Sequence, residues 1–180
     1  VQPQPHPGKF TLVHTGLFAS DGNPLCLWDA LSRKCAEDAE FRERLQIRLA
    51  GKTDPQIIAS IRDRGLDGNL VNLGYLPHTE TVREQKSADI LLLPLRQEPE
   101  YSKVLPGKIF EYLASGRPIL GIGQVDSAAA DILNDSGAGE MFDWHDGRGM
   151  MDFICSAHTP PHGAERYSRR NLTAQLVELL

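Results

Sequence analysis

The sequence predicts an α/β protein, a Rossmann-like doubly wound parallel sheet in a single domain. Short apolar runs alternate with amphipathic, helix-like segments from residue 10 to residue 143, and the connections between them are short. The run 89–94 is apolar on both faces, as expected of a central parallel strand. The length of 180 residues suits one such domain with a sizeable core. In this fold, ligands bind beyond the carboxyl ends of the strands.

The first half of the chain contains three expected strands, each followed by a helix. We expect the strands at 10–14, 45–50 and 69–74, and the helices at 25–41, 55–64 and 79–87. Asp54 is placed to cap the second helix with Pro55 at its first position, and Thr79 is placed to cap the third. The first helix has an apolar side and a charged side; its apolar positions are Leu25, Trp28, Leu31 and Cys35.

The second half of the chain continues this alternation. We expect strands at 89–94, 119–122 and 139–143, and helices at 107–115 and 126–135. Gly116 and Gly137 are the expected helix ends, because glycine readily adopts the left-handed conformation found there. The buried stripe expected of the helix 107–115 consists of Ile109, Phe110, Leu113 and Ala114.

The two ends of the chain differ from this middle part. Residues 1–9 are rich in proline, which is typical of a linker or N-terminal extension leading into a domain at 10–180. Periodic apolar residues predict a terminal helix at 164–180. We find neither a signal peptide nor an apolar run of roughly 18 residues, and we therefore expect a cytoplasmic protein without a transmembrane segment.

Charge and cysteine usage exclude several classes of function. The chain has 19 Lys and Arg against 24 Asp and Glu, so its net charge of −5 creates no general field for nucleic acid or anionic membranes. Cys26, Cys35 and Cys155 include no Cys-x-x-Cys pair, which argues against a disulfide framework or a structural zinc site. We interpret them as reduced thiols.

Two glycines that directly follow expected strands are candidates for a phosphate site. Gly16 and Gly51 either let a phosphate approach the backbone or simply let the chain turn. Lys52 follows Gly51, but the upstream glycine of a nucleotide-binding P-loop is missing, which excludes that class of ATPase. The segment 121–126 lacks the third glycine of a dinucleotide fingerprint.

The start of the helix 107–115 is the strongest candidate for binding an anion. Pro106 and Gly107 open a helix whose first turn has free N–H groups, and Lys103 and Lys108 lie on either side of them. This arrangement suits a diphosphate. Glu111, three residues after Lys108, either accepts hydrogen bonds from vicinal hydroxyls or forms a surface ion pair with Lys108.

The same segment resembles the donor-binding half of GT-B glycosyltransferases, above all the family-4-like (group 1) enzymes that build bacterial surface polysaccharides. The resemblance is carried by the motif Pro106-x-Lys108-x-x-Glu111-Tyr112-x-Ala114-x-Gly116-x-Pro118. Segments similar to other parts of the family follow in the same order at 13–16, 49–51, 71–77 and 87–94.

The resemblance implies a carboxyl-terminal donor domain that would be inactive alone and would need a second, acceptor-binding domain of the same protein. The enzyme would move a sugar from a nucleoside-diphosphate sugar to a saccharide or lipid-linked acceptor, with retention and without a cofactor or essential metal. Glu111 would bind the ribose, and main-chain groups near Tyr75 would meet the base. The implied donor-binding residues are Gly16, Gly51, Lys52, Tyr75, Leu76, Lys103, Val104, Leu105, Pro106, Gly107, Lys108 and Glu111.

The chain departs from the family pattern in its charged residues. Lys103 stands where the family has its first motif glutamate, and the loop 18–23 lacks the basic residues that many relatives use to neutralise the diphosphate. Lys52, Lys103 and Lys108 are therefore the candidate diphosphate stabilisers. His14 and His78 are either structural histidines or polar contacts at the edge of the site.

Two other classes of protein fit the same pattern. Sugar-nucleotide epimerases share the two-domain architecture, and a flavodoxin-like module could bind a ligand or partner without catalysis. Nucleotide titration separates the last class from the others.

Overall fold

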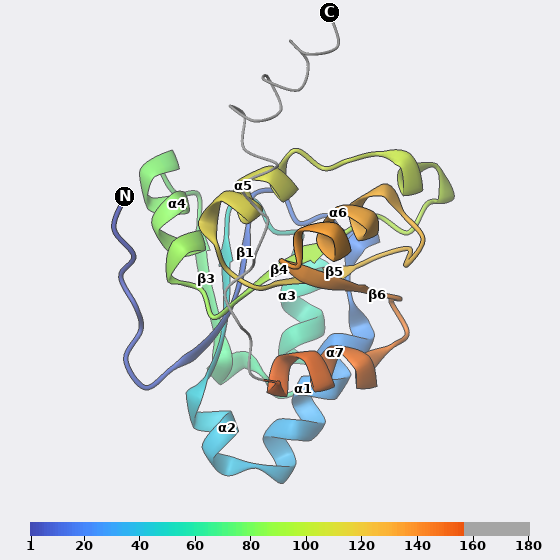
Figure 1. The fold of residues 1–180 in the computed structure, drawn as a ribbon. Helices are drawn as coiled ribbons and strands as arrows, with labels where there is room; N and C mark the ends of the chain where they lie inside the picture. Colours follow the sequence, from blue (N-terminus) through green and yellow to red (C-terminus); the bar gives the residue numbers. More distant parts are fainter. Residues whose placement is uncertain (157–180) are drawn as a thin grey trace, which may run out of the picture.

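The computed structural model describes residues 1–156, which form one six-stranded parallel sheet with helices on both faces (Figure 1). The strand order is β3-β2-β1-β4-β5-β6, which confirms the predicted doubly wound sheet. The strands are β1 (Phe10–Thr15), β2 (Leu45–Ala50), β3 (Leu70–Gly74), β4 (Ile90–Pro94), β5 (Ile119–Ile122) and β6 (Gly139–Phe142). The helices are α1 (Leu25–Glu37), α2 (Ala39–Arg44), α3 (Pro55–Arg62), α4 (His78–Ser87), α5 (Lys108–Ser115), α6 (Ala128–Ser136) and α7 (Gly147–Cys155). The predicted terminal helix at 164–180 lies outside the described residues.

The strand order reverses between β1 and β4, the two central strands. β1 pairs with β2 along its whole length but with β4 only at Leu12 and Val13. The carboxyl end of β1, from His14 onward, therefore lacks a β4 partner. Because ligands of doubly wound folds bind at such a reversal, the topology places the candidate site beside the end of β1.

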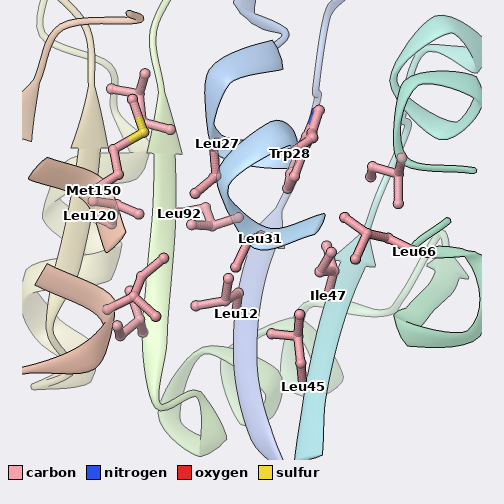
Figure 2. Packing of buried hydrophobic residues seen from close by; sticks show 14 of the residues in the cluster. Leu12, Leu27, Trp28, Leu31, Leu45, Ile47, Leu66, Leu92, Leu120 and Met150 are labelled. Carbon is pink, nitrogen blue, oxygen red and sulfur yellow. The ribbon is translucent and has the colours of Figure 1, made fainter. Parts of the chain in front are cut away.

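One face of the sheet is covered by α1, α3 and α7, and its core is apolar. Leu27, Trp28 and Leu31 of α1 are completely buried there. Figure 2 shows these three side chains in the apolar cluster that also contains Leu12 of β1 and Leu92 of β4. This face supplies the larger of the two cores.

The opposite face is covered by α4, α5 and α6. Its apolar core joins Val13 of β1 and Leu91 of β4 to Ile109 of α5 and Leu133 of α6. Leu12 and Val13 belong to different cores because successive side chains of a strand point to opposite faces. The helix α5, which carries the candidate anion site, therefore lies on the face opposite α1.

Several predicted helix boundaries are confirmed by their capping geometry. The Asp54 carboxylate accepts a hydrogen bond from the backbone N–H of Gln56 at 2.8 Å, and Pro55 is the first residue of α3. Gly116 and Gly137 end α5 and α6 with φ angles of 71° and 63°. Both are in the left-handed region that favours glycine.

Other boundaries differ from the prediction because of local capping. The expected helix 25–41 is interrupted at Asp38, whose carboxylate caps a second helix by accepting from the N–H of Phe41 at 2.9 Å. Leu25 is exposed at the start of α1 rather than buried. Thr79 does not cap α4, which begins one residue earlier with Pro77 in the cap position.

The buried stripe of α5 also differs from the prediction. Ile109, Tyr112 and Leu113 are buried, whereas Ala114 is exposed and Phe110 is half-buried. The phenol of Tyr112 is tolerated inside because its oxygen has a hydrogen-bond partner in β1, described below. This change turns a polar atom toward the sheet directly beside the candidate site.

The N-terminal residues run beside α4 before entering β1 (Figure 1). The backbone N–H of Gln4 donates to Ser87 Oγ at 2.7 Å, and Lys86 Nζ donates to the carbonyl of Val1 at 3.2 Å. Within residues 1–156, no helix is long and apolar enough to cross a bilayer.

Candidate functional site

The glycines that follow β1 and β2 are in close contact with each other. Gly16 and Gly51 have φ angles of 91° and 117°, which disfavour any residue with a side chain. A Cβ atom on Gly51 would lie only 2.4 Å from the carbonyl oxygen of Gly16. Close packing against Gly16 therefore explains why residue 51 is a glycine. The approach of a phosphate to the backbone of Gly51 stays a prediction.

The side chain of Lys108 reaches the end of β1. A Cβ atom on Gly16 would be 3.3 Å from Lys108 Cε, so the glycine leaves room for the lysine side chain. Lys108 Nζ lies 2.9 Å from His14 Nε2 and 3.4 Å from the carbonyl oxygen of Leu17. The lysine thus starts on the α5 face and passes over the end of β1 to a histidine that packs against Phe18.

The pair formed by His14 and Lys108 has a definite protonation pattern. Burial and the nearby lysine lower the pKa of His14 well below its ordinary value, so the imidazole is neutral. Since an ammonium only donates, His14 Nε2 accepts and the histidine proton is on Nδ1, for which no described residue is a partner. Burial also lowers the pKa of Lys108 to about 8, opposed by the charge of Glu111. The lysine charge is therefore only weakly compensated and is available to an anion.

The Glu111 carboxylate is held by a hydrogen-bond network rather than by Lys108. Gln85 Nε2, from α4, donates to Glu111 Oε2 at 3.3 Å and to Thr15 Oγ1 at 2.9 Å. The backbone N–H of Thr15 donates to the Tyr112 hydroxyl at 3.0 Å. Burial raises the pKa of Tyr112 to about 12, so this hydroxyl stays protonated. The alternative of a surface ion pair between Lys108 and Glu111 is wrong, because the Lys108 ammonium is directed to His14 instead.

The loop between β4 and α5 presents backbone N–H groups at the start of the helix. No described residue accepts a hydrogen bond from the N–H groups of Leu105, Gly107 or Lys108. The N–H of Val104, by contrast, donates to the carbonyl of Tyr101 at 3.1 Å and is occupied. Pro106 has no N–H group and accepts from Ile109 through its carbonyl. The start of α5 therefore offers three donors and a positive dipole end.

The remaining predicted residues lie around this centre and are mostly exposed. Lys52 follows β2 and Lys103 ends a short 3₁₀ turn at Pro99–Lys103; both side chains are exposed. Tyr75 follows β3, two strands from β1, and is 88% exposed, while Leu76 beside it is half-buried. His78 begins α4 on the surface. None of these side chains belongs to the network around Glu111.

Three residues of the network were absent from the sequence-based site, namely Thr15, Gln85 and Tyr112. Tyr112 belongs to the recognised motif, so its position next to Glu111 was a usable signal. Gln85 is 2% exposed in the polar helix α4, where nothing in the local sequence marks a buried amide. Only the packing of α4 against β1 and α5 identifies it.

Two pockets of about 460 Å³ occur elsewhere on the surface. One lies between α1 and the start of α7, beside Cys26, Arg33 and Arg148. The other lies near the amino end of β1, beside Phe10 and Phe41. Neither contains a predicted donor-binding residue. Within residues 1–156, no group of three or more His, Cys, Asp or Glu side chains is arranged to hold a metal ion.

A protein-family model described as "Glycosyl transferases group 1" matches residues 9–159. No curated protein sequence is significantly similar to the chain. Solved structures match its fold over almost its whole length, and their low sequence identities support a shared fold only.

Three such structures illustrate the likeness. WaaG, a glycosyltransferase involved in lipopolysaccharide biosynthesis, has a TM-score of 0.62 and 14% identity, over 96% of this chain and 42% of its own. A TarM mutant from S. aureus, in a complex that includes UDP, has a TM-score of 0.69 and 15% identity over 99% and 37%. Sucrose-phosphate synthase from Thermosynechococcus elongatus has a TM-score of 0.66 and 16% identity over 97% and 45%. The chain thus spans less than half of each neighbour.

Proposed function

The chain belongs to the glycosyl transferases group 1 family, and from that premise we propose that it is the donor-binding domain of a sugar-transferring enzyme. The donor is a nucleoside-diphosphate sugar and the acceptor a saccharide or lipid-linked saccharide. The acceptor is held by a second Rossmann-like domain of the same protein. The chain's short span relative to its structural neighbours supports that second domain.

The observation that carries this proposal is the first turn of α5. It presents a cation and a carboxylate one helical turn apart, Lys108 at the end of β1 and Glu111 in contact with α4. The lysine and the free N–H groups of Leu105 and Gly107 suit a diphosphate. The carboxylate suits the two hydroxyls of a ribose, since it only accepts hydrogen bonds.

The chemistry that follows is electrostatic. The bond between the anomeric carbon and the diphosphate oxygen breaks, and negative charge builds up on the departing diphosphate. The acceptor hydroxyl bonds to that carbon and gives its proton to a general base or to the departing diphosphate. Lys108 and the helix N–H groups stabilise this charge without a metal. We assign the stereochemical outcome as retention, following the family resemblance, and the general base, if one is used, to the acceptor domain.

We place the enzyme in the cytoplasm and in the synthesis of surface polysaccharides. The cysteines of the described chain, Cys26, Cys35 and Cys155, are free thiols, which supports a reducing compartment. The network around Glu111 also disfavours the flavodoxin-like alternative, because it prepares a carboxylate for a hydroxyl-bearing ligand.

Titration with UDP, GDP and ADP tests the proposal. We expect one of the three to bind, and we expect Lys108→Met to weaken it by roughly tenfold, the size of one charge-assisted contact. Lys9→Met is the matched control, since Lys9 lies at the opposite end of β1 and donates to the carbonyl of Glu43. The proposal fails if the folded chain binds none of the three at millimolar concentration, or if Lys108→Met and Lys9→Met bind equally well.

A further inference from the structure

We infer that Gln85 is a positioning residue for the donor ribose, acting through the carboxylate of Glu111. The inference rests on the proposed function, in which Glu111 receives the ribose hydroxyls. It concerns α4, a helix that carries none of the implied donor-binding residues.

Gln85 is buried between three elements. Its amide comes from α4, and its nitrogen donates to Thr15 Oγ1 of β1 at 2.9 Å and to Glu111 Oε2 of α5 at 3.3 Å. The orientation of the amide is fixed by chemistry, because its carbonyl oxygen in the same place would face a carboxylate that has no proton to donate. Both N–H groups of the amide are thus used, one to anchor the side chain and one to hold the glutamate.

The anchor is itself fixed by α5. The backbone N–H of Thr15 donates to the hydroxyl of Tyr112, the residue next to Glu111. Thr15, Gln85, Glu111 and Tyr112 therefore link β1, α4 and α5 in a closed circuit. Any displacement of the Glu111 carboxylate from its place has to break a hydrogen bond of a side chain that is 2% exposed.

Glu111 needs such a support because its own side chain is exposed. A free glutamate loses considerable rotamer freedom when it binds a ligand. Gln85 is the one described residue that donates to this carboxylate, and it uses only Oε2. The other oxygen, Oε1, has no described donor, and each carboxylate oxygen keeps further lone pairs for hydroxyls. Gln85 thus holds the Glu111 carboxylate in place, and the carboxylate can still accept hydrogen bonds from the hydroxyls of a ligand.

A purely structural role for Gln85 would give a different result from a positioning role. If the amide only joined α4 to β1, its loss would weaken the binding of all nucleotides equally or would not affect it. If it positions Glu111, its loss weakens only ligands that have ribose hydroxyls. The comparison of a nucleoside diphosphate with its 2′,3′-dideoxy form isolates this difference.

The test uses whichever of UDP, GDP and ADP binds best, together with its 2′,3′-dideoxy form. In Gln85→Met, which keeps the length and loses the donor, we expect the ribonucleotide to bind roughly three- to tenfold more weakly, about the net size of one ordinary hydrogen bond. The dideoxy form should bind as it does to the unaltered chain. In Glu111→Ala, adding Gln85→Met should change nothing further, because the two residues act as one unit.

A second variant keeps the test decisive if Gln85→Met does not fold. Gln85→Glu has the same shape and can accept from the Thr15 hydroxyl, but it repels Glu111, so ribose discrimination should fall at least as far. The inference is overturned if both nucleotides weaken equally, if neither weakens, or if Gln85→Met still acts in the Glu111→Ala background. Failure of the unaltered chain to bind any of the nucleotides would instead contradict the proposed function.

Discussion

The two faces of the sheet are built from different chemistry. Toward α1, α3 and α7, the strands present large apolar side chains such as Leu12, Ile47 and Leu92. Toward α4 and α5, the same strands present buried polar residues as well, including Thr11, Thr15 and Arg48. The difference separates stability from ligand chemistry: one face supplies most of the core, and the other prepares the groups that meet the ligand.

The polar face is stable because its buried groups have partners. Arg48 of β2 forms a two-pronged ion pair with Glu84 of α4, at 2.9 Å for each contact. Thr11 exchanges hydrogen bonds with Asp89 through both backbone and side chain. A buried polar group without such a partner costs about 1–3 kcal/mol, so these contacts are requirements of the fold.

The largest effect is expected on the apolar face, from Trp28→Ala. Trp28 is completely buried and donates its indole N–H to Asn23 Oδ1 at 2.8 Å. Its removal leaves a cavity and should lower the free energy of unfolding by about 3–5 kcal/mol. Denaturant unfolding followed by circular dichroism measures this. Variant molecules that remain folded should still bind nucleotide with the original affinity.

Leu25→Ala is the control on the same helix, since Leu25 is 46% exposed, and we expect a change within about 0.5 kcal/mol. Equal losses from the two variants would show that α1 does not hold the core as described. A loss of nucleotide affinity in folded Trp28→Ala would show that the two faces are not separate.

A smaller effect is expected on the polar face, from Tyr112→Phe. The substitution keeps the ring and removes the hydroxyl that accepts from the backbone N–H of Thr15. A buried donor is then left without a partner, and the free energy of unfolding should fall by about 1–3 kcal/mol. Nucleotide affinity should fall too, because Thr15 anchors the amide that holds Glu111.

Tyr101→Phe is the matched control for this variant. Its hydroxyl bonds to Arg96 in an exposed loop, so we expect almost no loss of stability. A Tyr112→Phe variant that is as stable as the Tyr101→Phe variant would contradict the closed circuit between β1, α4 and α5.

The parts of the fold that were predictable from sequence are those with a local sequence signal. The strands were found because each contains a short run of apolar residues or an alternation of apolar and polar ones. Both predicted glycine stops were confirmed because only glycine adopts their backbone conformation at low cost. The break of the first helix was missed because Asp38 is a charged residue among other charged residues. Its role as a cap depends on a hydrogen bond to Phe41 that periodicity does not record.

The candidate site, like the fold, was predictable from the sequence only where the signal lies within one short segment. Lys108 and Glu111 were found through a motif within one helix. Their partners, His14 and Gln85, lie 94 and 26 residues away in the sequence and contact them only in the folded chain. The polar sequence of α4 is typical of a solvated surface helix. A buried amide on such a helix follows from its position over the polar face of β1, which requires the sheet topology.

The smallest effect is a pH dependence that reports on Lys108 alone. Burial puts the pKa of this lysine at about 8 in the free chain. The charge of Glu111 offsets this lowering only in part, and His14 is neutral. A bound diphosphate favours the charged ammonium and raises this pKa, so binding takes up a proton above pH 8. Nucleotide affinity should therefore fall by roughly four- to eightfold between pH 7.5 and pH 9.

The Lys108→Met variant turns this profile into a difference measurement. It binds more weakly at pH 7.5, but it has no ammonium to lose, so its affinity should be nearly flat over the same range. The ratio of the two affinities should then approach one as the pH rises, because the unaltered chain progressively loses the charge that the variant lacks. Parallel pH profiles for the two proteins, measured by calorimetry, would mean that Lys108 keeps its proton throughout. The ammonium that crosses from the polar face to His14 would then be an ordinary surface charge.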